Sequence, residues 1–163
     1  GSIETVFDQG GHLRHIAADE ERGRLYVSDM AKGRVFVHDI ASGETRTLLR
    51  TESHPNTIVL SPDKRILFIS CRGRNNPRSY HLPGPELGVV MIVDALEGRV
   101  LDVILGGNQP TGLDLSPDGR MLASSDFLDH RISVYAIPPT EELLKSDGGR
   151  RSVYKKEMAK SEW

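Results

Sequence analysis

The side chains best suited to binding a ligand gather in one stretch, between Cys71 and Gly88. Its arginines carry planar guanidinium groups that match carboxylate or phosphate. The candidate ligand-binding residues of this stretch are Arg72, Arg74, Asn75, Arg78, Tyr80 and His81. Its prolines and glycines restrict the backbone, unlike a flexible Gly/Ser linker. The stretch therefore predicts a shaped lid for a small anion or a peptide. The competing interpretation is a tolerated surface insertion whose arginines meet neighbouring acids.

Two histidines, His12 and His54, complete the predicted binding set, because they stand at equivalent points of a repeat described below. A metal site would need a third ligand, such as Asp29 or Asp126, and no short-range spacing enforces one. The competing interpretation is that these polar residues cap the starts of strands. We therefore expect no metal and no cofactor.

The sequence shows no arrangement of nucleophile, base and orienting group, so no catalytic residue is predicted. Cys71 stands at a strand end with no helix N-terminus beside it, which favours a packed small residue over a nucleophile. As the only cysteine, it excludes an internal disulfide. The net charge of −2 excludes nucleic-acid binding through overall basicity. The longest aliphatic run, Val89–Val93, is too short to span a membrane.

A repeat fixes the elements that must position these residues. Three segments align without gaps, beginning at His12, His54 and Gln109, and each is followed by a turn and β-rich runs. The starts lie 42 and then 55 positions apart, and the excess of 13 falls within the Cys71–Gly88 stretch. A period near 40 with four short strands is typical of a β-propeller blade. A sandwich would not repeat the same turn.

We therefore expect an all-β fold of β-propeller blades, three four-stranded antiparallel units. The predicted boundaries are 1–10 for a cleavage scar and a lone strand, 11–52 for blade 1, 53–107 for blade 2 with an insertion at 72–87, 108–145 for blade 3 and 146–163 for a basic tail. Blade 3 lacks a convincing outer strand, because Pro138-Pro139 is followed by helix-favouring residues. The tail is expected to be solvated, or to be a partner-binding helix anchored by Tyr154, Met158 and Trp163.

The motif Pro-x-x-x-x-Leu-Ser-Pro-Asp-Gly at 110–119, followed by two strands and a Gly hairpin, resembles the YVTN-type bacterial β-propeller repeats. The first repeat departs from it, with Asp19-Glu-Glu-Arg-Gly23 at the turn. The resemblance implies the fold and favours a periplasmic or secreted location. Proteins with similar repeats include lactone-hydrolysing propellers. By this resemblance, the candidates for acid–base and oxyanion roles would be His12, His54, Arg72 and Glu86. Without a catalytic signature, a non-enzymatic binding or scaffold module is favoured.

Three blades cannot close a ring, since propellers have about four to eight. The chain is therefore expected to be part of a longer propeller or half of a six-bladed dimeric ring. In the second case Ile3–Phe7 would complete the last blade of a second copy of the chain. The expected partners are that copy or the missing blades, with a small anion or peptide as ligand.

Overall fold

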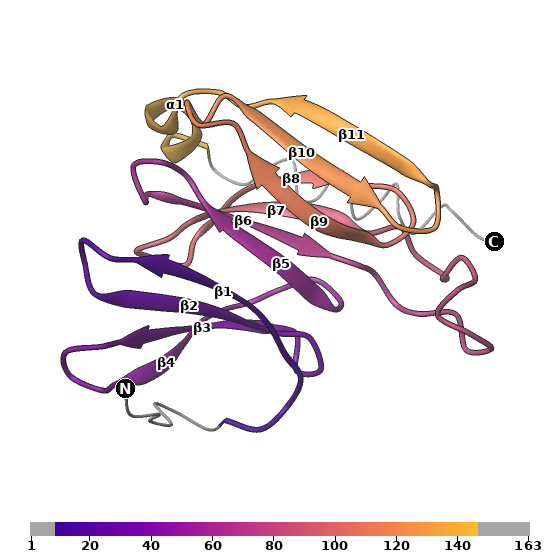
Figure 1. Ribbon diagram of the computed structural model, residues 1–163, viewed down its shortest axis with the longest axis horizontal. Helices are drawn as coiled ribbons and strands as arrows, with labels where there is room; N and C mark the ends of the chain where they lie inside the picture. The colour runs from indigo at the N-terminus through magenta and orange to yellow at the C-terminus, as the bar shows by residue number, and fades with distance from the viewer. Residues whose placement is uncertain (1–8, 147–163) are drawn as a thin grey trace, which may run out of the picture.

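The computed structural model describes residues 9–146, which form three antiparallel sheets and one short helix (Figure 1). The first sheet contains β1 (Leu13–Asp19), β2 (Arg24–Asp29), β3 (Arg34–Asp39) and β4 (Thr45–Arg50). The second contains β5 (Pro55–Leu60), β6 (Ile66–Cys71), β7 (Val89–Asp94) and β8 (Val100–Leu105). The third contains β9 (Pro110–Leu115), β10 (Met121–Asp126) and β11 (Arg131–Ala136), and α1 (Thr140–Leu144) follows. In each sheet, strands consecutive in the chain pair side by side.

The Ser-Pro-Asp turns explain why the first two strands of a sheet fold back on each other. Ser116 Oγ donates to Asp118 Oδ1 at 2.5 Å and accepts a backbone N–H from the start of the next strand at 2.9 Å. Ser61 and Asp63 repeat this geometry in the second sheet, with distances of 2.5 and 2.9 Å. The serine and aspartate therefore satisfy the turn locally, as such side chains do in tight turns.

The sheets pack face to face through two apolar clusters. Val35 and Val37 of the first sheet contact a cluster that includes Ile58 and Leu67 of the second. The second cluster joins the other face of the second sheet to the third, through residues such as Val90, Ile92, Leu113 and Leu122. The first strands β1, β5 and β9 lie beside one another, as the inner strands of propeller blades do. The predicted class of propeller blades is confirmed.

The third sheet has three strands among residues 9–146, and the chain then leaves it. Leu143 of α1 is buried in the cluster between the second and third sheets. Arg99, in the turn just before β8, donates to the carbonyl oxygens of Leu144 at 2.8 Å and Ser146 at 2.7 Å. The helix therefore packs back on the second sheet instead of extending the third. The predicted strand 3–7 and basic tail lie outside the described residues.

Candidate binding site at the insertion face

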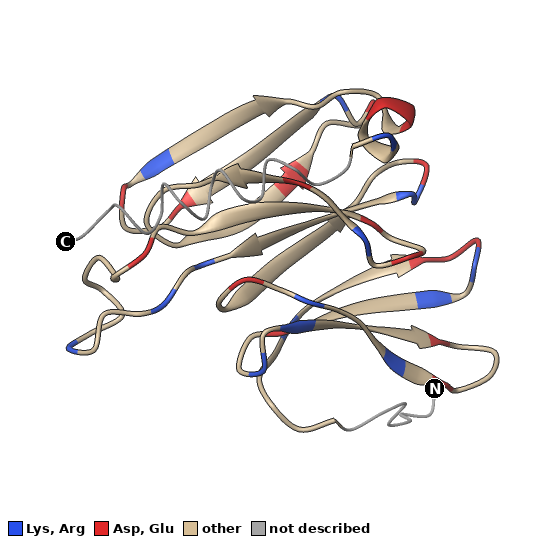
Figure 2. Ribbon diagram, turned by 180° about the vertical axis from the view of Figure 1, so that it is seen from behind, with Lys and Arg blue, Asp and Glu red and all other residues tan. Residues whose placement is uncertain are grey.

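The insertion connects β6 to β7 and extends from the end of the sheets opposite α1 (Figure 1). The three repeat starts lie at the same end, since their carbonyl oxygens accept the backbone N–H that follows the second strand of each sheet. These bonds are Met30 to His12 at 2.9 Å, Arg72 to His54 at 3.0 Å and Phe127 to Gln109 at 3.0 Å. We call this end of the molecule the insertion face. Figure 2 shows that most charged residues lie at strand ends and in loops, including those of the insertion.

Arg72 anchors the insertion to the third sheet through Gln109. Its guanidinium donates to the side-chain oxygen of Gln109, which is itself buried. Gln109 Nε2 in turn donates to the carbonyl oxygen of Tyr80 at 2.9 Å and to Asn75 Oδ1 at 3.5 Å. Three predicted binding residues are thus brought together by Gln109. The repeat alignment placed Gln109 beside the two histidines, but its side chain was not predicted to bind.

A second guanidinium, that of Arg14, belongs to the same region and was not predicted. Its Nε donates to Asn56 Oδ1 at 3.1 Å, so it crosses from the first sheet to the second. Burial lowers the pKa of Arg72, and the nearby positive charge of Arg14 lowers it further. Arg72 Nε is buried and has no hydrogen-bond partner among residues 9–146. We call Arg14, Asn56, Arg72 and Gln109 the mouth cluster.

The mouth cluster spans all three sheets and carries two positive charges. Within residues 9–146, the hydrogen bonds of its arginine side chains go to neutral amide oxygens, which do not compensate the charges. Arg14 is exposed, whereas Arg72 is half-buried. A half-buried cation with a neutral partner favours an anion nearby. The repeat alignment could have pointed to Arg14. Arg14 is the second residue of its inner strand, as Asn56 and Thr111 are of theirs.

The two remaining arginines of the insertion make their hydrogen bonds within the insertion itself. The backbone N of Arg74 donates to Glu86 Oε1 at 2.8 Å, and its Nε to Glu86 Oε2 at 3.3 Å. This pair closes the base of the insertion, as the structural interpretation of its arginines expected. Arg78 is exposed, and its backbone N donates to Asn76 Oδ1 at 2.9 Å.

The aromatic residues of the insertion lie against each other. The ring centroids of Tyr80 and His81 are 3.9 Å apart, and His81 lies 6.1 Å from Phe127 at the end of β10. Tyr80 and Phe127 are both largely exposed. They form an aromatic edge beside the mouth cluster that suits a peptide or a ring-bearing ligand.

His54 lies in an open groove of about 450 Å³ between the first two sheets at the insertion face. Its basic lining residues are Lys32, Arg50, His54 and Arg74. His54 Nδ1 is buried and has no hydrogen-bond partner in the described part of the chain. His12 is exposed, and its backbone N donates to Asp29 Oδ1 at 3.1 Å. Glu52 lines the groove as well, so the groove presents charges of both signs beside the mouth cluster.

The buried acids at the strand ends are engaged in structural contacts. Asp29 accepts from Arg34 Nε at 3.2 Å, and Asp126 accepts from Arg131 Nη2 at 3.0 Å. Cys71 takes the equivalent position in the second sheet, where complete burial raises the pKa of its thiol far above the usual range. Within residues 9–146 no group of three or more His, Cys, Asp or Glu side chains could hold a metal. In the same range, no helix is long and apolar enough to cross a membrane.

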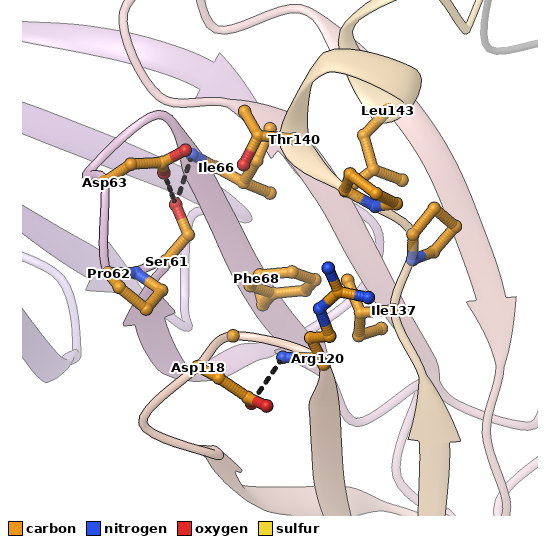
Figure 3. Close-up of a pocket in the computed structure, with 13 residues that line it drawn as sticks. Ser61, Pro62, Asp63, Ile66, Phe68, Asp118, Arg120, Ile137, Thr140 and Leu143 are labelled. Carbon is orange, nitrogen blue, oxygen red and sulfur yellow. Dashed lines mark hydrogen bonds between the residues drawn. The ribbon is translucent and has the colours of Figure 1, made fainter.

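A second cavity of about 250 Å³ lies at the opposite end, beside α1 (Figure 3). Phe68, Ile137 and Leu143 supply its apolar walls. Asp118 lines it too, but the Ser116 hydroxyl and a backbone N–H bind its carboxylate and lower its pKa. Asp63 and Arg120 line the cavity too, so it carries charges of both signs, whereas the arginine side chains of the mouth cluster donate to neutral amide oxygens.

Comparisons with known proteins support the fold. No protein-family model matches the chain. The chain is 44% identical over 134 residues to antigen Lp49 of Leptospira interrogans, an alignment that covers 82% of this chain and 29% of the relative. The chain thus spans less than a third of the length of this curated relative.

Three solved structures are similar at the level of the fold. Hydrazine synthase of Kuenenia stuttgartiensis has a TM-score of 0.62 and 18% identity, covering 84% of this chain and 37% of that one. A nidogen/laminin complex has a TM-score of 0.65 and 20% identity, covering 83% and 49%. A proposed 6-phosphogluconolactonase of Bacteroides fragilis has a TM-score of 0.58 and 19% identity, covering 77% and 35%. These neighbours are β-propeller proteins, and at such identity they show the fold alone.

Proposed function

We propose that this chain is a non-enzymatic β-propeller binding module, with repeats of the YVTN type, that holds a small anion or a peptide carboxylate at the insertion face. The observation that carries the proposal is the pairing of Arg14 and Arg72 with amide oxygens in the mouth cluster. An arriving carboxylate or phosphate would compensate both charges through charge-assisted hydrogen bonds.

Two features of the insertion face support binding: its contacts are organised by Gln109, and a groove lies beside it. Gln109 holds Arg72, Asn75 and the Tyr80 backbone together, so the site is organised before a ligand arrives, which lowers the entropic cost of binding. The groove at His54 offers room for a ligand longer than a single anion. A site of this size and openness suits an extended polar ligand.

The lactone-hydrolysing alternative finds less support in the same contacts. Glu86, its candidate acid or base, is bound by both the backbone and the guanidinium of Arg74. Both carboxylate oxygens of Glu86 thus already accept hydrogen bonds from Arg74, which leaves Glu86 less available to a substrate. A lactone-hydrolysis assay of the purified chain is expected to show no turnover above background.

The binding proposal is tested by calorimetric titration with citrate, inorganic phosphate and a short acidic peptide. At least one probe is expected to bind, with an affinity that falls as salt is added. Arg72→Gln removes the charge but keeps a polar side chain, and is expected to weaken binding about tenfold or more. Arg14→Gln is expected to act similarly.

Arg78→Gln is the matched control, because Arg78 belongs to the same insertion but is exposed outside the mouth cluster. Its affinity for the bound probe should equal that of the unmodified chain. The proposal is refuted when no probe binds at millimolar concentration. It is also refuted when Arg72→Gln binds as well as the Arg78 control.

A further inference from the structure

The third sheet presents an apolar face that lies open to solvent. Ile132 and Val134 of β11 are 72% and 63% exposed. Strand pairing shows which residues of the other sheets are equivalent, because Ile132 pairs with Ser125 as Val35 pairs with Ser28 and Val90 with Ser70. Val35 and Val90 are both fully buried against the next sheet. The third sheet thus has an interface side chain on which none of the sheets formed by residues 9–146 packs.

The first sheet presents the complementary half of such an interface. Ile16 of β1 is 60% exposed. It pairs with Val27 as Ile58 pairs with Ile69 and as Leu113 pairs with Ser124. Ile58 and Leu113 are the buried residues that the second and third sheets present to the sheet before them. The chain therefore carries both halves of the contact that joins its own sheets.

The same hydrogen bond recurs at both boundaries between neighbouring sheets. The third sheet carries a further equivalent donor, and the first sheet a further equivalent acceptor. Ser28 Oγ donates to the carbonyl oxygen of Asn56 at 2.6 Å, across the first boundary. Ser70 Oγ donates to the carbonyl oxygen of Thr111 at 2.9 Å, across the second. Ser125 is the equivalent donor of the third sheet, and the backbone carbonyl of Arg14 is the equivalent acceptor of the first. These two groups lie at opposite ends of the chain's row of sheets.

We propose that the exposed face of the third sheet docks on the exposed face of the first sheet of a second copy of this chain. The contact occurs twice, once in each direction, and closes a ring of six blades with two-fold symmetry. Six lies within the four to eight blades of closed propellers, and two-fold dimers are the commonest closed assemblies. A second copy is the occupant we propose, since it carries the matching residues in register.

Docking would bury the apolar residues of both faces and form the third repeat of the serine bond. Ile132 and Val134 of one copy would contact the surface around Ile16 of the other. Ser125 of one copy would donate to the carbonyl oxygen of Arg14 of the other. An apolar face of this kind left in water marks an interaction surface.

The test is the mass of the full chain by size-exclusion chromatography with light scattering, over about a hundredfold range of concentration. A mass of two chains is expected. Val134→Asp and Ile16→Asp should each give monomers, because each places a charge in both contacts of the ring. Ile40→Asp is the control, since Ile40 is also exposed but lies in a turn beyond β3. It should remain a dimer.

A mixture of the two interface variants separates this arrangement from others. Val134→Asp and Ile16→Asp chains can form one unmodified contact together, so the mixture should regain part of the dimer. All the substituted side chains are exposed, and circular dichroism should show each variant folded. The proposal is overturned when the unmodified chain is monomeric throughout, as expected if other polypeptides supply the missing blades. It is equally overturned when Ile16→Asp stays dimeric, which would mean that two third sheets pack together.

Discussion

Replacing Ser28 by alanine tests whether the serine bonds hold the sheets together. Ser28 is fully buried, and its Oγ donates to the carbonyl oxygen of Asn56 at 2.6 Å while accepting the backbone N–H of His15 at 3.1 Å. Alanine leaves the Asn56 carbonyl unpaired in a buried boundary. An unsatisfied buried polar group costs about 1–3 kcal/mol. We therefore expect Ser28→Ala to lower the free energy of unfolding by about 2 kcal/mol.

Ser125→Ala is the matched control for this prediction. Ser125 Oγ accepts the backbone N–H of Gly112 at 3.0 Å, as Ser28 accepts that of His15, but within one chain it meets no following sheet. Only contacts within the third sheet are then lost, namely this bond and the contact of Ser125 Oγ with Thr111 Oγ1 at 3.3 Å. Water can replace them, so the expected cost is below about 1 kcal/mol. Ser70→Ala should resemble Ser28→Ala, because Ser70 bridges to Thr111.

The assay is urea unfolding followed by circular dichroism, with every variant made in the Val134→Asp background so that association does not contribute. Equal slopes of the free energy against urea would show that the unfolded states are comparable. The structural role of the Ser28 bond is refuted when Ser125→Ala lowers the free energy of unfolding as much as Ser28→Ala does. It fails as well when Ser28→Ala costs less than about 0.5 kcal/mol, since the buried carbonyl would then have found another partner.

Three further perturbations test the turns and the buried thiol. Lys64→Gly should raise the free energy of unfolding by about 0.5 kcal/mol in urea titrations, because Lys64 has φ of 58° where the equivalent residue, Gly119, has 71°. Hydrogen bonds from the Ser116 hydroxyl and a backbone N–H lower the pKa of Asp118, so its stabilisation is complete above its ordinary value of 3.8 and is lost as pH falls through the lower, folded value. Asp118→Asn should therefore reduce the fall in melting temperature on acidification. Burial raises the pKa of Cys71, so a thiol reagent should react with it only after unfolding, as absorbance at mildly alkaline pH would show.

The fold could be predicted because the same local signals recur in register. Each turn is built from its own side chains, as Ser116 and Asp118 show, so its geometry depends little on the rest of the molecule. The missing outer strand of the third sheet was also visible, since Pro138-Pro139 interrupts the strand pattern. The position of α1 was not predictable, because it depends on Leu143 entering a cluster formed by two sheets.

The candidate site was predicted only in part, because sequence distance conceals its contacts. Arg72 was identified from its place in an arginine-rich insertion. Arg14 resembles an ordinary surface charge on a strand, and only the arrangement of β1 beside β5 brings it to Asn56. Gln109 was recognised as a repeat start, but its role in holding the insertion depends on where the Tyr80 backbone folds back.

The two proposals meet at Arg14, which belongs to both the mouth cluster and the open face of the first sheet. Its guanidinium turns towards Asn56 within the chain, while its carbonyl oxygen occupies the position that accepts a serine hydroxyl from a preceding sheet. Closing the ring would therefore fix the strand that carries one of the two cations. By thermodynamic linkage, a ligand that binds the closed ring more tightly must strengthen the dimer by the same factor. The proposals still fail separately, because Arg72→Gln leaves both apolar faces intact and Val134→Asp leaves both guanidinium groups in place.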